Sequence, residues 1–191
     1  MRFCLTSLTL ALLLVVRAAA LAAPIDFTPT EGSRTLEGVV FKQIYFHQEG
    51  KIISYEQPRG WSYSGDPGGL RLTPPDITQA QVTVQQAALP APQVFDDATN
   101  QQLQQISLGA APANAQNVTL LGEEKNPLQI LQQPTYGVTL GYSFLGQEYE
   151  ANVLFVNLGD TQVRFRTVAR KKDFEQVLRA FRGSLFSLSW Q

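Results

Sequence analysis

The last third of the chain carries the pattern that most restricts its possible folds. Between Gly137 and Arg170, three runs rich in apolar residues are separated by short turns at Gly146-Gln147 and Gly159-Asp160. In "GVTLGYSFL" every second residue is apolar, so these side chains share one face of a strand: Val138, Leu140, Tyr142 and Phe144. Short turns containing glycine join antiparallel neighbours, and the segment therefore predicts a three-stranded antiparallel meander.

An amphipathic helix is expected after the meander. In "KKDFEQVLRAFRG" the apolar residues have the i, i+3, i+4, i+7 spacing of one helix face: Phe174, Val177, Leu178 and Phe181. Asp173 is suited to the N-cap and Gly183 to the position after the helix, which predicts a helix over 173–182. The ending "SLFSLSW" is expected to form a last strand.

The first half of the chain predicts several strands. The apolar run 36–48, a turn at 49–51 and the run "IISYEQ" predict an antiparallel hairpin. Shorter strands are expected in "LRL", in the alternating "QAQVTVQQ" and at 118–124, where Asn126-Pro127 breaks the pattern.

A weaker helix is predicted over 96–106. Asp96 or Asp97 is a suitable N-cap, and Thr99, Leu103 and Ile106 form a thin apolar stripe. The elements together predict an α+β fold class, with an antiparallel β-sheet covered by the C-terminal amphipathic helix and by this middle helix in an α/β/α sandwich-like arrangement.

Residues 1–22 have the features of a secretory signal peptide. Arg2 precedes an apolar run, and small residues allow cleavage after Ala22 or, as the nearest alternative, after Ala20. The apolar run 3–16 is shorter than the ~20 residues of a spanning helix, which disfavours an uncleaved anchor. We therefore predict an exported protein, periplasmic or extracellular (lumenal in a photosynthetic host), with an extended, exposed leader at 23–35 and a single α+β domain at 36–191.

Composition disfavours several classes of function. Cys4, the only cysteine, lies in the predicted signal, so we expect the mature chain to have neither a disulfide nor a thiol nucleophile. Without Arg2 and Arg17, the 15 basic residues become 13 against 16 acidic ones, a formal charge of −3. This balance argues against nucleic acid as a partner, since its binders concentrate basic residues. No polybasic cluster or second apolar span predicts stable membrane insertion after signal cleavage.

The sequence also carries no recognisable catalytic or metal-binding constellation. His47 is the only histidine and ends a predicted strand, so a structural role is favoured over that of a general base, and a zinc site would need more ligands. Glu148 and Glu150 share a strand face, and we expect Arg164 and Arg166 on the same side, where cross-strand ion pairs explain all four residues. We predict a non-catalytic protein without cofactors.

Several segments resemble the PsbP/Mog1-like superfamily. They are "ISYEQPRGW", "LRLTPPDITQAQVTVQQ", the meander and the ending "FEQVLRAFRGSLFSLSW", in which Ser184 and Ser187 approximate a serine of the family's ending. The resemblance covers residues 50–191 and rests on pattern. It implies helices over an antiparallel sheet and mostly non-enzymatic roles, as in photosystem accessory subunits, a small-GTPase-binding factor and exported bacterial proteins. It carries no catalytic residues to this chain.

The stretch "YEQPRGWSYSGDPGGLRL" provides the first group of candidate binding residues. Arg59, Trp61 and Tyr63 combine an arginine with aromatic side chains, as interaction hot spots do, although Trp61 is better suited to capping the core. The loop 64–69, which contains Asp66, is the more suitable place for recognition because loops vary without disturbing packing.

Arg164 and Arg166 form the second group, either as an anion or partner contact or as a solvated strand face. The leading functional prediction is a partner-binding or accessory module of the cell envelope, bound to an envelope or extracellular protein. The alternative is a carrier or sensor of a small apolar or anionic ligand, in a pocket lined by Tyr142, Phe144, Phe155 and Phe165. A carboxylate-based enzyme is the least favoured hypothesis.

Overall fold

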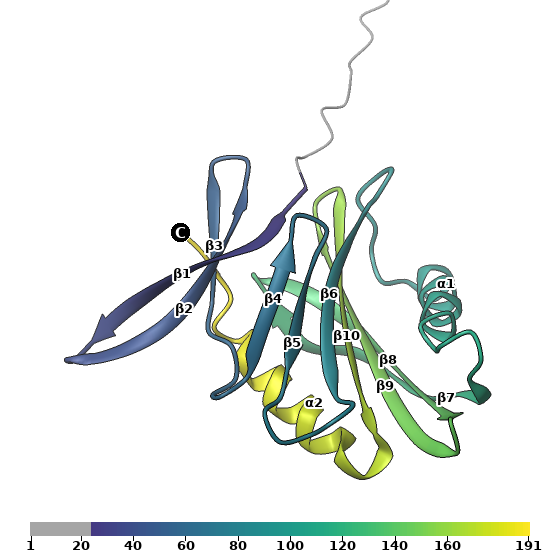
Figure 1. The fold of residues 1–191 in the computed structure, drawn as a ribbon. Coiled ribbons are helices and arrows are strands. Elements are labelled where there is room, and N and C mark those ends of the chain that lie inside the picture. The colour runs from purple at the N-terminus through teal and green to yellow at the C-terminus, as the bar shows by residue number, and fades with distance from the viewer. Residues whose placement is uncertain (1–23) are drawn as a thin grey trace, which may run out of the picture.

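The computed structural model describes residues 24–191, which form two antiparallel sheets and two helices (Figure 1). The predicted signal peptide and Cys4 lie outside the described residues. The predicted α+β class is confirmed, because the C-terminal helix packs on a large antiparallel sheet. Within residues 24–191 no helix combines the length and apolar character needed to cross a membrane.

The larger sheet has the predicted meander near its centre, in the strand order β4-β5-β6-β10-β9-β8-β7. The strands are β4 Ser62–Asp66, β5 Gly69–Thr73, β6 Gln81–Ala88, β7 Gln116–Ile130, β8 Gln133–Phe144, β9 Gln147–Leu158 and β10 Thr161–Arg170. Gly146 and Gly159, in the two meander turns, have φ values of 73° and 70°. Glycine adopts this left-handed conformation without steric strain, which explains why short turns are possible here.

β7 is one continuous edge strand and does not stop at Asn126-Pro127 as predicted. Its pairing with β8 shifts register between Lys125 and Gln129, on either side of Pro127. At a bulge one residue is left outside the hydrogen-bonded ladder, so a proline, which has no N–H to donate, is tolerated there. An edge strand also needs hydrogen bonds on one side only. The strand therefore continues past the proline.

The smaller sheet, β1-β2-β3-β11, corrects the prediction of an exposed leader at 23–35. Its strands are β1 Asp26–Leu36, β2 Val39–Gln48, β3 Lys51–Tyr55 and β11 Ser189–Trp190. The hairpin of β2 and β3 is as predicted, but β1 adds to it. Ile25, just before β1, and Phe27 are buried in the main core, the apolar cluster enclosed by α2 and the two sheets. Most other residues of β1 are exposed, so the strand lacks the apolar alternation by which it could be recognised.

α2 (Lys171–Leu185) buries the predicted apolar stripe but is longer than predicted at both ends. It begins directly after Arg170, without a side-chain capping bond, so Asp173 lies in the first turn instead of at the N-cap. It continues through Gly183, whose φ is not positive. A glycine marks a helix end only where the chain turns into left-handed backbone, and here it does not.

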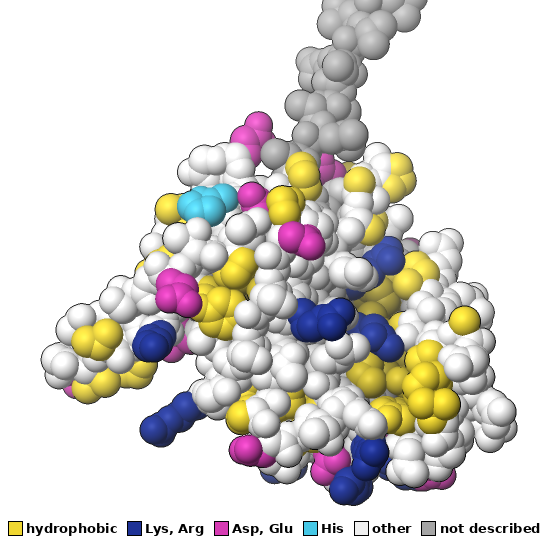
Figure 2. All heavy atoms as spheres, in the orientation of Figure 1, with side chains coloured by type: hydrophobic (Ala, Val, Ile, Leu, Met, Phe, Trp, Pro, Cys, Tyr) yellow, Lys and Arg dark blue, Asp and Glu magenta, His cyan; other side chains and the backbone are white. Residues whose placement is uncertain are grey.

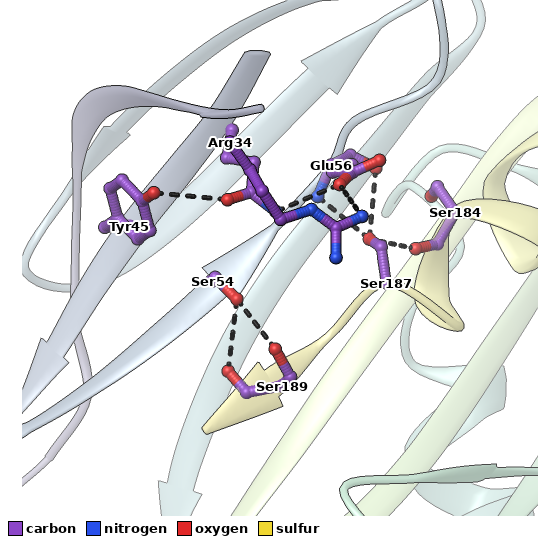
Figure 3. Close-up of polar contacts among 8 residues, drawn as sticks. Arg34, Tyr45, Ser54, Glu56, Ser184, Ser187 and Ser189 are labelled. Carbon is purple, nitrogen blue, oxygen red and sulfur yellow. Dashed lines mark hydrogen bonds and ion pairs between the residues drawn. The ribbon is translucent and has the colours of Figure 1, made fainter. Parts of the chain in front are cut away.

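The C-terminal segment connects α2 to the smaller sheet through serine hydroxyls (Figure 3). Ser54 Oγ lies 2.8 Å from Ser189 Oγ, and the backbone N–H of Glu56 donates to Ser187 Oγ over 2.8 Å. Of the predicted last strand only Ser189–Trp190 forms, because residues 184–185 belong to α2 and residues 186–188 form the turn that leaves the helix. These long-range bonds hold the C-terminus against β3 and close one end of the main core.

α1 (Asp97–Leu108) lies on the opposite face of the larger sheet from α2. Asp96 is the N-cap, and its Oδ1 accepts a hydrogen bond of 2.8 Å from the backbone N–H of Thr99, as predicted. The predicted stripe is wrong in part, because Ile106 is exposed. The buried face consists of Asn100, Leu103 and Ser107. These residues also have a helical i, i+3, i+7 spacing, so the spacing of residues alone could not show which of the two helix faces is buried.

Candidate functional site

The strand register brings three arginines together on the face of the larger sheet opposite α2. Arg71 on β5 and Arg166 on β10 are both paired with Thr83 of β6, and Arg164 lies two residues before Arg166. Directly paired residues of antiparallel strands point to the same face, as do residues i and i+2. We call Arg71, Arg164 and Arg166 the arginine face. Figure 2 shows Lys and Arg side chains gathered over β5, β6 and β10, beside a hydrophobic area toward α1.

Strand geometry determines the spacing on this face. The Cα atoms of Arg71 and Arg166 are separated by the width of two strand spacings, about 10 Å, and those of Arg164 and Arg166 by about 7 Å. Gln85 is paired with both Gly69 and Arg164, so it extends the surface toward the β4–β5 loop. Each guanidinium carries five N–H donors, which makes the face rich in donors for an anionic partner.

None of these three guanidinium groups has a carboxylate partner among residues 24–191. The ion pairs of that part of the chain use other cations: Arg34, Lys125, Lys171 and Arg182. Arg164 Nε donates to Gln162 Oε1 over 2.9 Å, and its guanidinium carbon lies 6.0 Å from the centroid of the Phe155 ring. Both contacts orient the arginine without neutralising its charge.

Two of the arginines are partly buried. Burial lowers the pKa of Arg164 and of Arg166, because it disfavours the charged form, and the Tyr142 hydroxyl partly offsets this effect at Arg166. The Nε of Arg166 is buried without a hydrogen-bond partner. A desolvated cation without a counter-charge is unfavourable in the isolated protein, and an anionic group from a partner would relieve the penalty.

The predicted ion pairs between Glu148 or Glu150 and the two arginines of β10 do not form. Glu150 is paired with Ala169 of β10, which belongs to the main core under α2, so the carboxylates lie on the face opposite the arginines. Glu148 Oε2 instead lies 3.2 Å from Lys171 Nζ. The prediction gave the right strands but the wrong relative register, and a shift by one residue exchanges the faces.

A shallow groove of about 540 Å³ adjoins the arginine face. Loop 64–69 forms one side of it, and Arg71, Thr83 and Gln85 are among the residues that line it. Asp66 Oδ1 accepts hydrogen bonds from the backbone N–H groups of Gly68 (2.8 Å) and Gly69 (3.1 Å), which hold the loop. A Cβ at Gly69 would lie 2.7 Å from the carbonyl oxygen of Val84, so the close approach of the chains here requires glycine. Asp66, a sequence candidate, thus lies beside the arginine face.

The other candidates of the opening stretch lie elsewhere. Trp61 is buried in the main core, as expected for a core cap. Tyr63 is paired with the core residue Leu72 and donates its hydroxyl hydrogen to Glu31 Oε1 over 2.7 Å. Burial and this carboxylate raise the pKa of Tyr63 to about 12. Arg59 is exposed in the turn before Trp61. The structure therefore brings Asp66, but not the two aromatic residues, to the side of Arg164 and Arg166.

Arg71, Thr83 and Gln85 belong to the site but were not among the sequence candidates. Arg71 lies between two buried leucines of "LRL", a pattern that indicates a side chain pointing away from the core. The pattern does not show which strands lie beside β5 in the sheet. The pairing of β6 with β10 joins residues far apart in the chain, and it alone places Arg71 two strands from Arg166.

The structure does not supply the apolar ligand pocket predicted within the meander. Phe165 faces the main core, and its ring centroid lies 5.9 Å from that of Phe181. Tyr142, Phe144 and Phe155 instead lie in or against a second apolar cluster, which occupies the α1 face of the larger sheet. The void in the main core measures about 40 Å³. Small-molecule sites typically measure roughly 300–1,000 Å³. The four residues thus do not share one cavity.

His47 is exposed on β2, where it is paired with Asp26 of β1 and Ile52 of β3. Across residues 24–191, His, Cys, Asp and Glu side chains form no group of three or more that could hold a metal ion. We therefore take the arginine face and its groove as the candidate functional site.

Comparison with solved structures shows a shared fold at low sequence identity. LpqN, described as involved in cell envelope biogenesis of Mycobacterium tuberculosis, is similar with a TM-score of 0.51 and 11% identity, over 85% of this chain and 91% of that one. The fold is shared with LpqN. PA94 of Pseudomonas aeruginosa, a protein of unknown function described as a putative regulator, has a TM-score of 0.44 and 10% identity over 80% and 92%.

The solution structure of cyanobacterial PsbP from Synechocystis sp. PCC 6803 has a TM-score of 0.46 and 14% identity, over 85% of this chain and 92% of that one. No protein-family model and no curated protein matches the sequence. At this identity the similarity to LpqN shows the fold alone, and the function has to be argued from the residues.

Proposed function

We propose that this protein is an exported, non-catalytic binding module of the cell envelope, and that an acidic partner protein docks on the arginine face. The observation that carries the proposal is the set of three arginines on one sheet face, without a carboxylate from residues 24–191 to neutralise them. Guanidinium groups bind carboxylates through parallel N–H donors and are enriched at interaction hot spots.

Other observations support the cellular setting. The signal-peptide features of residues 1–22 support export. The fold shared with LpqN, a protein described as involved in cell envelope biogenesis, supports an envelope role. The rigid backbone under the site also fits binding. The arginines lie on hydrogen-bonded strands of the larger sheet, so their positions are fixed before a partner arrives.

A second candidate function is carriage of a small anionic ligand in the groove beside the arginine face. The groove of about 540 Å³ has the size of a small-molecule site, and Arg71 lines it. The carboxylate of Asp66 also lines the groove and would repel a small anion held there, whereas an acidic partner protein can contact Arg164 and Arg166, which lie outside the groove.

Photocross-linking from Thr83 tests the proposal, because this residue lies between Arg71 and Arg166. A benzophenone amino acid at position 83, expressed in the native host, should yield one discrete protein adduct in the envelope fraction. The adduct should fail to form when irradiation is carried out at high salt, which screens exposed charges and so weakens the docking of the partner. Native mass spectrometry of the same preparation would reveal a small bound ligand instead.

Two charge variants make the test specific. Arg71→Gln with Arg164→Gln should abolish the adduct. Arg59→Gln with Lys172→Gln removes the same number of positive charges away from the arginine face and should leave the adduct unchanged. An adduct that survives the first double substitution, or the absence of any adduct from position 83 in exported protein, would contradict the proposal.

A further inference from the structure

The hairpin of β1 and β2 ends in an exposed apolar tip. Within residues 36–41, the exposed fraction is 52% for Leu36, 56% for Val39, 63% for Val40 and 36% for Phe41. In the rest of residues 24–191, exposed large apolar residues occur singly or as one adjacent pair. A concentration of apolar side chains on a projecting element marks a surface that is covered in the functional state.

The tip belongs to an arm, which we define as residues 32–42, that projects from the body of the molecule (Figure 1). β3 pairs with β2 only from Ile44 onward. The pairs from Gly32–Gln43 to Leu36–Val39 therefore form a ribbon of two strands. An isolated two-stranded ribbon is of marginal stability in water, so packing against a further surface would stabilise the arm.

The arm is nevertheless held in one direction. Its turn, Glu37-Gly38, has φ values of 48° and 79°, as in the tight two-residue turns of hairpins. The ring of Tyr45 lies over Gly32, where a Cβ would have no room. Arg34 Nη2 donates to Glu56 Oε1 over 3.2 Å, and Figure 3 shows this link between the arm and the segment after β3. The tip is thus presented in a preorganised position.

A groove with matching properties lies along α2. It measures about 410 Å³ and runs between the helix and the bulged part of β7. Leu128 and Leu178 contribute buried apolar surface to it, and Phe186 stands at its side with 74% of the residue exposed. The groove is apolar at its base, so it suits the side chains of Val39, Val40 or Phe41.

The charges of the two surfaces are complementary. The arm carries Glu37 at its turn and Lys42 on its stem, and the groove is lined by Arg179 and Glu175, one helical turn apart. All four side chains belong to exposed residues, and none is in an ion pair with another described residue. With the turn directed toward Arg179, Lys42 would approach the Glu175 end of the groove.

We propose that the occupant of the groove is the arm of a second copy of this chain. Arm and groove are different surfaces of one molecule, so two copies related by a two-fold axis make both contacts at once. The dimer then closes without leaving an apolar tip exposed. The groove lies on the α2 side, opposite the arginine face, so this inference does not rest on the proposed function.

Cysteine pairing tests the contact directly. In full-length protein with Cys4→Ser, a Val40→Cys chain is mixed with a Gly183→Cys chain under mild oxidation. Gly183 lines the groove and has open space around its Cβ position. The mixed disulfide should form at least about tenfold faster than that between Leu145→Cys and Gly183→Cys, because docking raises the effective concentration of the two thiols. Equal rates would overturn the proposal.

Light scattering after size exclusion gives a second measurement. At about 100 μM the wild-type protein should have twice the mass of one chain, and Val40→Ser should reduce the dimer at least tenfold. Val94→Ser, an equally conservative change at another exposed valine, should leave the dimer intact. Arg164→Gln should also leave it intact, which separates this inference from the proposed function. A monomer, or a monomer that binds anionic phospholipid vesicles through Val40, would overturn it.

Discussion

Replacement of Leu185 by alanine tests whether the main core, enclosed by α2 and the two sheets, dominates the stability of this protein. Leu185 is 2% exposed, and it borders the void of about 40 Å³ together with residues from both sheets. Alanine has the highest helix propensity, so the change does not weaken the helix itself. The substitution therefore isolates the contribution of side-chain packing.

The expected loss follows from how far the surroundings can collapse. Leucine-to-alanine changes in cores reduce the free energy of unfolding by about 2–5 kcal/mol, and the loss grows with the cavity that remains. The existing void shows that the neighbours of Leu185 leave space unfilled. They are held on two hydrogen-bonded sheets, which restricts their movement. We therefore expect a loss in the upper part of this range, about 4 kcal/mol.

Urea denaturation followed by far-ultraviolet circular dichroism measures this loss. With a slope of about 2 kcal/mol per molar urea, the midpoint should fall by about 2 M while the slope stays constant. Leu145→Ala is the matched control, because Leu145 is 81% exposed in the β8–β9 turn. It should change stability by no more than about 0.5 kcal/mol. A loss below about 1 kcal/mol for Leu185→Ala, or one equal to that of the control, would refute the reasoning.

Three further predictions concern other contacts. Gly65→Ala should destabilise the fold by about 1–3 kcal/mol in the same urea assay. The added Cβ would lie 2.4 Å from the carbonyl oxygen of Phe27 and would separate β4 from β1. An unchanged urea midpoint would contradict this prediction. Asn100→Leu should raise the melting temperature, because the side-chain Oδ1 and Nδ2 atoms of Asn100 are buried without hydrogen-bond partners. A lower melting temperature would show that these atoms do have partners. Arg182 donates to both carboxylate oxygens of Glu124 and holds the pKa of Glu124 below its usual value. This stabilisation is present at neutral pH and is lost as the pH falls from about 4.5 through the folded-state pKa. For so exposed a pair it amounts to about 1 kcal/mol, and Glu124→Gln should remove that part of the acid dependence measured by urea denaturation at several pH values.

The elements that could be predicted from the sequence are those with strong local signals. The meander has alternating apolar residues and glycine turns, and α2 has a complete apolar stripe, so both follow from residues close together in the chain. β1 was missed, because its outer part is exposed and shows no alternation. The end of α2 was misplaced for a related reason, since Gly183 permits a helix end but does not require one.

The candidate site was predicted only in part. Arg164 and Arg166 were recognised because they alternate with apolar residues on one strand, and Asp66 because it lies in a loop, which can vary without disturbing packing. Their counter-charges were assigned wrongly. Glu148 and Glu150 are close to the arginines in sequence, but the register of β9 with β10 places them on the other face.

The sequence by itself determined the α+β class, the meander, the two helices and the absence of cysteine from residues 24–191, because each depends on composition or on short-range periodicity. Only the tertiary structure decided that β5, β6 and β10 are neighbours, that Arg71 joins Arg164 and Arg166, and that the arm leaves the body as a ribbon of two strands. Strand pairing joins distant segments, and its register follows from the packing of the whole core. A one-residue change in that register would exchange the core face and the arginine face.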